Sequence, residues 1–94
     1  MIAMVATLKI KEGHEAEFEA AAGKLAAAVR ENEPGNHLYQ LCKGSEPQTY
    51  YFIERYESEE ALAAHGGSAH MKEHGGAMGP HMAGRPEILK LEEV

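Results

Sequence analysis

Apolar and polar side chains alternate over the first ten residues, and this alternation predicts a β-strand over residues 2–10. Successive side chains of a strand point to opposite sides of a sheet, so one face of this strand is apolar throughout. That face carries Ile2, Met4, Ala6, Leu8 and Ile10. Because the opposite face is half apolar as well, we expect both faces to be at least partly covered.

A helical period follows Gly13 and predicts a helix over residues 14–32. Glutamates crowd its first turns and Arg30 lies in its last turn, as the helix dipole favours. Pro34 disfavours helical geometry at Glu33, so we expect the helix to end there. The apolar stripe of this helix is formed by Phe18, Ala22, Leu25 and Val29.

Three more segments read as strands. Residues 37–43 and 49–56 are rich in tyrosine and aliphatic side chains, and the short turn-rich link between them is typical of a hairpin. Residues 87–93 alternate between apolar and charged side chains and predict the last strand.

The segment between the third and fourth strands predicts short helices. Ser58 is a favourable N-cap residue, and the two glutamates after it suit the first turn of a helix that ends near His65. Ser68 is expected to begin a further short helix through His74, and the glycine pair after His74 is expected to end it. Residues 77–85 contain a proline and two more glycines and are expected to be irregular.

The predicted order of elements is β-α-β-β-α-β, which indicates an α+β protein of the ferredoxin-like, split β-α-β type. We expect one domain over residues 1–94, with the helices on one face of a four-stranded antiparallel sheet. The other face would be bare in a monomer. Its apolar side chains favour a homodimer that packs sheet against sheet.

Charge and cysteine content narrow the class of protein. The formal net charge of −6 argues against nucleic acid and against anionic membrane surfaces as partners, because both require a basic face. Cys42 is the single cysteine, so no disulfide can form within one chain. No signal peptide and no apolar run long enough to span a bilayer is evident. We therefore expect a cytoplasmic protein.

These features, taken in order, resemble the antibiotic biosynthesis monooxygenase (ABM) superfamily and its quinol monooxygenase-like members. The closing segment GRPEILKLEEV is similar to the last strand of that family. The other matching residues are the turn Glu33–Pro34–Gly35, Tyr39 four residues later, and the spaced set Glu54, His65 and His70. The resemblance implies a dimeric α+β barrel.

Members of this family catalyse several reactions, and two features of the chain bear on which reaction and which cofactor to expect. Haem-degrading members use an asparagine, a tryptophan and a histidine, whereas this chain has no tryptophan and places Ala6 and His65 at the first two positions. Nothing in the chain is expected to cradle a flavin or a nicotinamide, because no GxGxxG follows a strand. We therefore expect no cofactor.

Histidines are the main candidates for chemistry. His65 and His70 flank a glycine pair that permits a tight bend, so both imidazoles are expected to face one cavity, and imidazoles exchange protons near neutral pH. Glu54 is the candidate that orients a histidine, and it can instead pair with Arg55 or Lys90. Alternatively, the two histidines only cap helix ends or line a dimer surface.

A metal site is not expected. His70 and His74 stand four residues apart, as in a two-histidine zinc site, but zinc needs further ligands. Glu73 would face elsewhere on such a helix, and His81 lies beyond a glycine-rich loop. No HExxH pattern or cysteine cluster supplies the missing ligands.

Candidate substrate contacts lie on the strands. Tyr39 and Tyr51 are expected to orient an aromatic substrate through their hydroxyl groups. Met4 and Ala6 of the first strand are candidate substrate contacts as well. At least one tyrosine of the third predicted strand must face the helices, because alternation separates Tyr51 from its neighbours.

The leading hypothesis is a cofactor-independent monooxygenase that oxidises a small aromatic quinol or phenol with dioxygen after histidine-assisted deprotonation. Two alternatives stay open. One is a proton-shuttling isomerase of a small carbonyl compound, which the resemblance extends to a phosphorylated sugar derivative. The other is a non-catalytic dimer that binds a small molecule.

Overall fold

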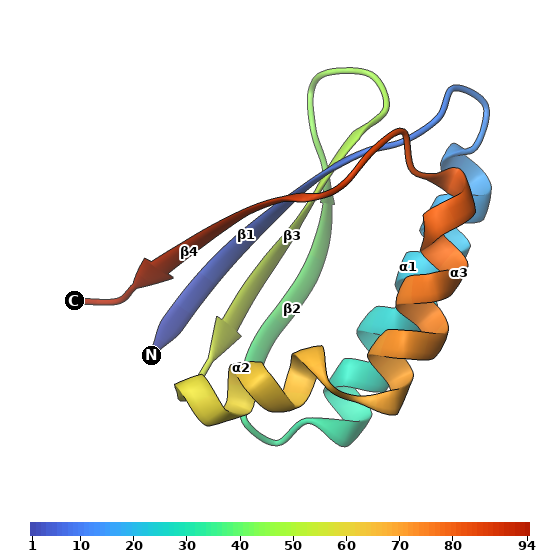
Figure 1. Cartoon of the computed structure of the whole chain (residues 1–94). Coiled ribbons are helices and arrows are strands. Elements are labelled where there is room, and N and C mark those ends of the chain that lie inside the picture. Colours follow the sequence, from blue (N-terminus) through green and yellow to red (C-terminus); the bar gives the residue numbers. More distant parts are fainter.

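The computed structural model describes residues 1–94 and consists of a four-stranded antiparallel sheet with helices packed on one face (Figure 1). The sheet order is β2-β3-β1-β4, which confirms the predicted α+β ferredoxin-like fold. The strands are β1 (Ile2–Lys9), β2 (Asn36–Lys43), β3 (Thr49–Tyr56) and β4 (Glu87–Glu92). The helices are α1 (Glu15–Asn32), α2 (Glu59–Gly66) and α3 (Gly76–Met78).

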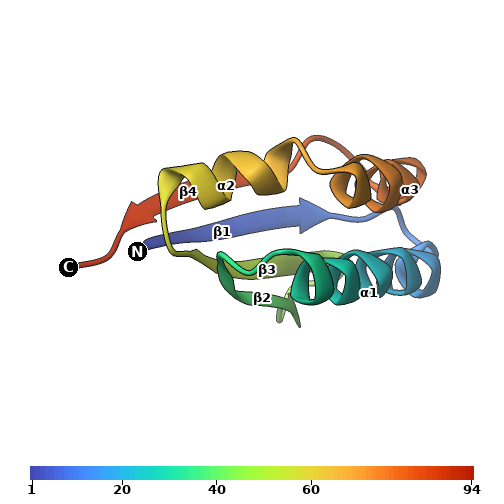
Figure 2. The same ribbon diagram turned by 90° about the horizontal axis from the view of Figure 1, so that it is seen from below.

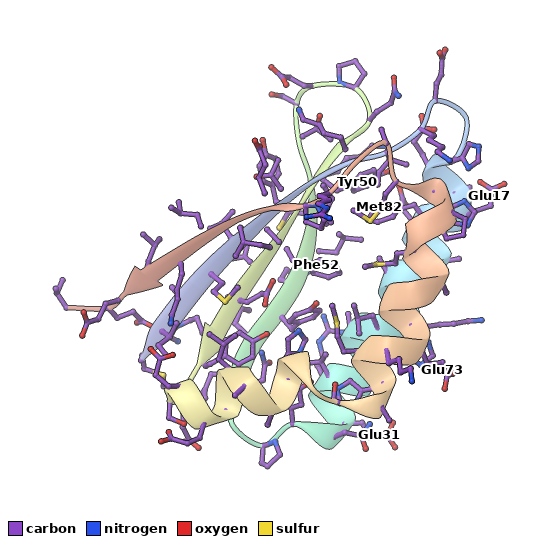
Figure 3. The ribbon with its side chains drawn as sticks, viewed as in Figure 1. Glu17, Glu31, Tyr50, Phe52, Glu73 and Met82 are labelled. Carbon is purple, nitrogen blue, oxygen red and sulfur yellow. The ribbon has the colours of Figure 1, made fainter.

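Strand register sorts the side chains of the sheet onto its two faces. Ala6 of β1 lies opposite Phe52 of β3 and opposite Ile88 of β4, and Met4 lies opposite Glu54. These side chains point toward the helices, as Figure 3 shows for Phe52. The apolar face predicted for β1 is therefore the helix-facing one.

Helix α1 forms as the apolar period predicts. Phe18, Ala22, Leu25 and Val29 are all buried, and they join sheet residues in one hydrophobic cluster. Burying each large apolar side chain stabilises the fold by roughly 1.5–3 kcal/mol. Viewed from below, α1 lies toward the side of the sheet that carries β2 and β3, whereas α2 lies toward the side that carries β4 (Figure 2).

The predicted start of α2 is confirmed, because the Ser58 hydroxyl accepts a hydrogen bond from the Ala61 N–H at 3.1 Å. The prediction that a glycine pair ends the next helix is wrong. Gly75 and Gly76 adopt right-handed helical dihedral angles, and a π-helical turn (Met71–Gly75) continues through α3 into a 3-10 turn (Gly79–His81). Glycine permits a chain reversal but does not impose one.

The sheet face away from the helices carries apolar side chains from several strands. Leu89 and Leu91 of the edge strand β4 are 56% and 45% exposed, and Leu38 of β2 is 36% exposed. They share this face with Val5 and Ile53, according to the register. No helix of the protein is long and apolar enough to cross a membrane.

A close backbone approach joins the end of α1 to α2. The Gly35 carbonyl accepts a hydrogen bond from the Glu57 N–H at 2.9 Å, just before α2 begins. A Cβ atom added to Gly35 would lie 2.6 Å from the Cβ of Ala61, a separation that real side chains do not adopt. The absence of a side chain at Gly35 thus lets α2 pack against the turn that carries Glu33.

We expect Gly35→Ala to destabilise the protein by about 1–3 kcal/mol, because the added methyl group overpacks this contact. Urea unfolding of Gly35→Ala, Ala61→Gly and the double variant measures the coupling. The double variant should recover part of the loss, since Ala61→Gly removes the clashing atom. Strictly additive effects would show that the contact does not limit how α2 packs.

Candidate functional site

A cavity of about 230 Å³ lies between the sheet and the helices. Most of its wall is apolar, and its polar groups come from Tyr39, Glu54 and His65. Small-molecule sites have this composition, in which apolar walls surround a few convergent polar groups. The apolar wall includes Met4, Ala6, Leu8, Phe52, Met71 and Met78.

His65 stands in the last turn of α2, where its ring forms part of the cavity wall. Its Nδ1 lies 2.9 Å from Oε2 and 3.2 Å from Oε1 of Glu33. The ring packs against the rings of Tyr39 and Tyr56, with centroids 5.2 and 5.4 Å away. Because Nδ1–H donates to the Glu33 carboxylate, Nε2 is the nitrogen left to accept a proton.

Glu33 is the site residue that sequence reasoning missed. Pro34 forces it into an extended conformation directly after α1, which separates its side chain from the helix. Its side chain is only 8% exposed, and its ionic partners are His65 and His70. The turn Glu33–Pro34–Gly35 is part of the resemblance to the ABM superfamily, but nothing in the sequence indicates a contact with His65, which lies 32 residues further along.

His70 does not face the cavity, contrary to the expectation from its spacing. Its Nε2 contacts Oε2 of Glu33, and its ring borders an outer hollow of about 380 Å³ rather than the cavity. Ser68 fixes the intervening bend: its hydroxyl donates to the His65 carbonyl at 2.7 Å and accepts from the Met71 N–H at 3.2 Å. The bend therefore directs both imidazoles at one carboxylate.

Glu54 is buried in the cavity wall and accepts a hydrogen bond from the Tyr56 hydroxyl at 2.6 Å. The ion pairs considered for it do not form, because Arg55 pairs with Glu93 and Lys90 pairs with Glu59. Burial raises the pKa of Glu54, and the nearby charge of Glu33 raises it further. The Tyr56 hydrogen bond and His65 act in the opposite direction but are outweighed.

The expected substrate contacts are divided between the two faces of the sheet. Met4, Ala6 and Tyr39 line the cavity. Burial, followed by the charges of Glu54 and Glu33, raises the pKa of Tyr39, so its hydroxyl stays protonated. Tyr51 is the correction: it pairs with Thr7 and Cys42 on the opposite face, because alternation along β3 turns it away from Phe52.

One group of side chains has the donor atoms of a metal site. The ligand atoms of Glu33, His65 and His70 all lie within 4.8 Å of one another. His74, paired with His70 in the sequence argument, is not among them and approaches Glu73 at 3.6 Å instead. Glu73 extends from the outer side of the helix into solvent, as expected (Figure 3).

Comparison with known proteins assigns the chain to a family. The sequence profile described as antibiotic biosynthesis monooxygenase matches residues 1–75, which is most of the chain. The chain belongs to the antibiotic biosynthesis monooxygenase family. The resemblance seen in the sequence is thereby confirmed, and the described site lies almost entirely within the ABM match.

Solved structures support the ABM assignment. A Caulobacter crescentus protein, provisionally described as an antibiotic biosynthesis monooxygenase, is 47% identical, with a TM-score of 0.95 over 99% of this chain and 89% of that chain. Proteins with similar descriptions from Nitrosomonas europaea (20% identity, TM-score 0.90, 100% and 99% coverage) and Bordetella bronchiseptica (24%, 0.85, 99% and 96%) share the ABM fold. None of the curated proteins matches the chain significantly.

The raised pKa of Glu54 predicts a pH-dependent stability. A carboxyl group whose pKa is higher in the folded than in the unfolded protein stabilises the fold fully at pH values below its unfolded-state pKa. This stabilisation is lost as the pH rises through the folded-state pKa. Glu54→Gln cannot ionise, yet it keeps an acceptor for Tyr56. We therefore expect the free energy of unfolding of Glu54→Gln, relative to wild type, to increase from pH 4 toward neutral pH.

Urea unfolding of both proteins from pH 4 to pH 8 measures this difference. A matched control is Glu60→Gln, an exposed carboxylate at the start of α2. A stability difference between Glu54→Gln and wild type that stays constant over this range would contradict the expectation.

Proposed function

We propose that the protein is a cofactor-independent monooxygenase that oxidises a small aromatic phenol or quinol with dioxygen. The observation that supports this most is the position of His65, which belongs to the cavity wall and is held through Nδ1 by Glu33. The family and the descriptions of its structural relatives support a monooxygenase. The substrate and the chemical steps are our proposal.

His65 acts as the base of the proposed reaction. Nε2 accepts the phenolic proton, and the imidazolium that forms is paired with Glu33 across the Nδ1–H hydrogen bond. Such a pair stabilises positive charge on the ring in a site that is largely shielded from water. Tyr39 remains protonated and serves as a hydrogen-bond donor to a substrate oxygen.

Dioxygen is the only co-reactant that this scheme requires. The phenolate passes one electron to dioxygen, and the resulting radical and superoxide combine to form a C–O bond at a ring carbon that bears hydrogen. The imidazolium returns its proton to the distal peroxide oxygen, the C–H proton is lost, and water leaves. The products are a quinone carbonyl and one water, so no external reductant is consumed.

The cavity favours a small and uncharged substrate. A cavity of about 230 Å³ exceeds one that holds benzene, at about 150 Å³, by enough for ring substituents. Neither lysine nor arginine lines it, whereas Glu54 does. A phosphorylated substrate would bring negative charge to a site with no cation, which argues against the phosphosugar form of the isomerase alternative.

The first experiment is oxygen uptake with a panel of benzoquinols and naphthoquinols, corrected for spontaneous autoxidation. His65→Gln should lower kcat about 100-fold or more, because general acid–base groups contribute at least this much. His74→Gln is the matched control, since His74 lies outside the cavity. Uptake should survive treatment with a chelator.

Equal oxygen uptake by wild type and His65→Gln would remove His65 from the reaction. The absence of enzymatic uptake with every quinol would favour the isomerase or the binding protein. Turnover of a small carbonyl compound without oxygen would then separate these two.

We also propose that the protein functions as a homodimer that pairs the sheet faces opposite the helices. Leu38, Leu89 and Leu91 expose apolar surface there, and apolar side chains gathered on one exposed face are typical of an interaction surface. A second copy of the same face provides complementary apolar contacts by two-fold symmetry.

Leu89→Glu should convert the dimer to a monomer, because it places a charge within the proposed apolar interface. Sedimentation equilibrium measures the mass. Lys90→Glu is the control, since it adds the same side chain to the other face of β4. A monomeric wild type, or a Leu89→Glu variant that remains dimeric, would contradict the proposed interface.

A further inference from the structure

We propose that Glu33, His65 and His70 form a binding site for a divalent transition-metal ion, of which Zn²⁺ is the best match. The three side chains come from the end of α1, the end of α2 and the segment that follows it. Their ligand atoms form the one group of three or more histidine, cysteine or carboxylate donors in the chain that lies within metal-binding reach.

The spacing of the donors suits tetrahedral coordination. Zinc bonds to histidine nitrogen and carboxylate oxygen are about 2.0–2.1 Å long, so neighbouring ligand atoms lie about 3.3 Å apart. Nδ1 of His65 lies 2.9 and 3.2 Å from the two oxygens of Glu33. The 2.9 Å contact and the closer contact between His70 and Glu33 would both have to lengthen to admit an ion.

Charge favours a cation at this position. The Glu33 carboxylate is nearly buried, and its partners are two imidazoles rather than a lysine or an arginine. A buried carboxylate needs positive charge or hydrogen bonds beside it, and a divalent ion supplies the charge without requiring protonated rings. Two histidines, one carboxylate and an open position form a ligand set that zinc accepts.

The outer hollow provides an entry path and room for a water ligand. Glu33 and His70 both border it, at the side of the cluster away from the cavity. Glu57 and Glu60 are the other charged residues that line it, and neither lysine nor arginine does. This acidic mouth raises the local concentration of cations.

Metal binding would have a defined consequence for the cavity. A neutral imidazole bound to a metal through Nδ1 keeps its hydrogen on Nε2. Nε2 of His65 then donates a hydrogen bond and cannot accept a proton. On the function proposed above, zinc is therefore an inhibitor, whereas binding itself does not depend on that function.

Calorimetric titration of the untagged full chain with ZnCl₂ at pH 7.5 tests the site without any substrate. Wild type should bind one Zn²⁺ per chain. Glu33→Gln and His70→Gln should each weaken binding about tenfold or more, since each variant loses one ligand. Circular dichroism of each variant verifies the fold, and His70, at the edge of the cluster, tolerates substitution better than Glu33.

The chain offers a matched control in a second histidine pair. Nδ1 of His14 lies 3.0 Å from Nδ1 of His81, but no third donor joins this pair. His14→Gln should leave the zinc affinity unchanged. The proposal is overturned if wild type binds no zinc, if both cluster variants bind it as tightly as wild type, or if His14→Gln alone abolishes binding. Oxygen uptake without metal tests the proposed function separately.

Discussion

The nearly buried carboxylate of Glu33, held between two imidazoles, is the constraint on which the site depends. A carboxylate removed from water is costly unless donors surround it. Its donors come from residues 32 and 37 positions further along the chain. The end of α1, the end of α2 and the bend after it must therefore meet at one point, and the contact between Gly35 and Ala61 makes that meeting sterically possible.

Two carboxylates approach His65 from different surroundings, and the surroundings assign them different roles. Glu33 receives hydrogen bonds from two rings beside the outer hollow, which suits a charged acceptor. Glu54 lies in the cavity wall with a single tyrosine donor, and burial raises its pKa. A raised pKa lowers the negative charge that Glu54 would present to a phenolate in the cavity.

The fold could be predicted from the sequence because its elements have clear periods and clear ends. The stripe from Phe18 to Val29 and the alternation of β1 are local properties, and the order of elements then restricts the topology. The predicted helix end at the glycine pair after His74 is wrong because glycine allows a helix to end without requiring it. The prediction for Tyr51 is wrong because the sheet face on which a tyrosine lies depends on strand register. Pairing of β3 with β1 and β2 sets that register.

The candidate site was harder to predict, since its decisive contact is long-range. His65, Glu54 and Tyr39 could be selected by residue type and by the resemblance to the family, but their partners could not. Arg55 and Lys90 are plausible partners for Glu54 from neighbouring positions of the sheet, yet each pairs with another glutamate. Glu33 carried only a turn signal, and nothing local connects a turn before β2 with a helix end after β3.

Four histidines lie between residues 65 and 81, yet their number alone does not locate a site. His65 and His70 share Glu33, His74 stays beside an exposed glutamate, and His81 meets His14 across the molecule. What distinguishes His65 is that its ring belongs to the cavity wall while its Nδ1 contacts Glu33, which borders the outer hollow. A neutral imidazole carries one N–H hydrogen, on either Nδ1 or Nε2. The group bound at Nδ1 therefore determines whether Nε2 accepts a hydrogen bond or donates one. On the proposed function and metal site, an ion bound beside the outer hollow would therefore control the chemistry of the cavity through a single imidazole.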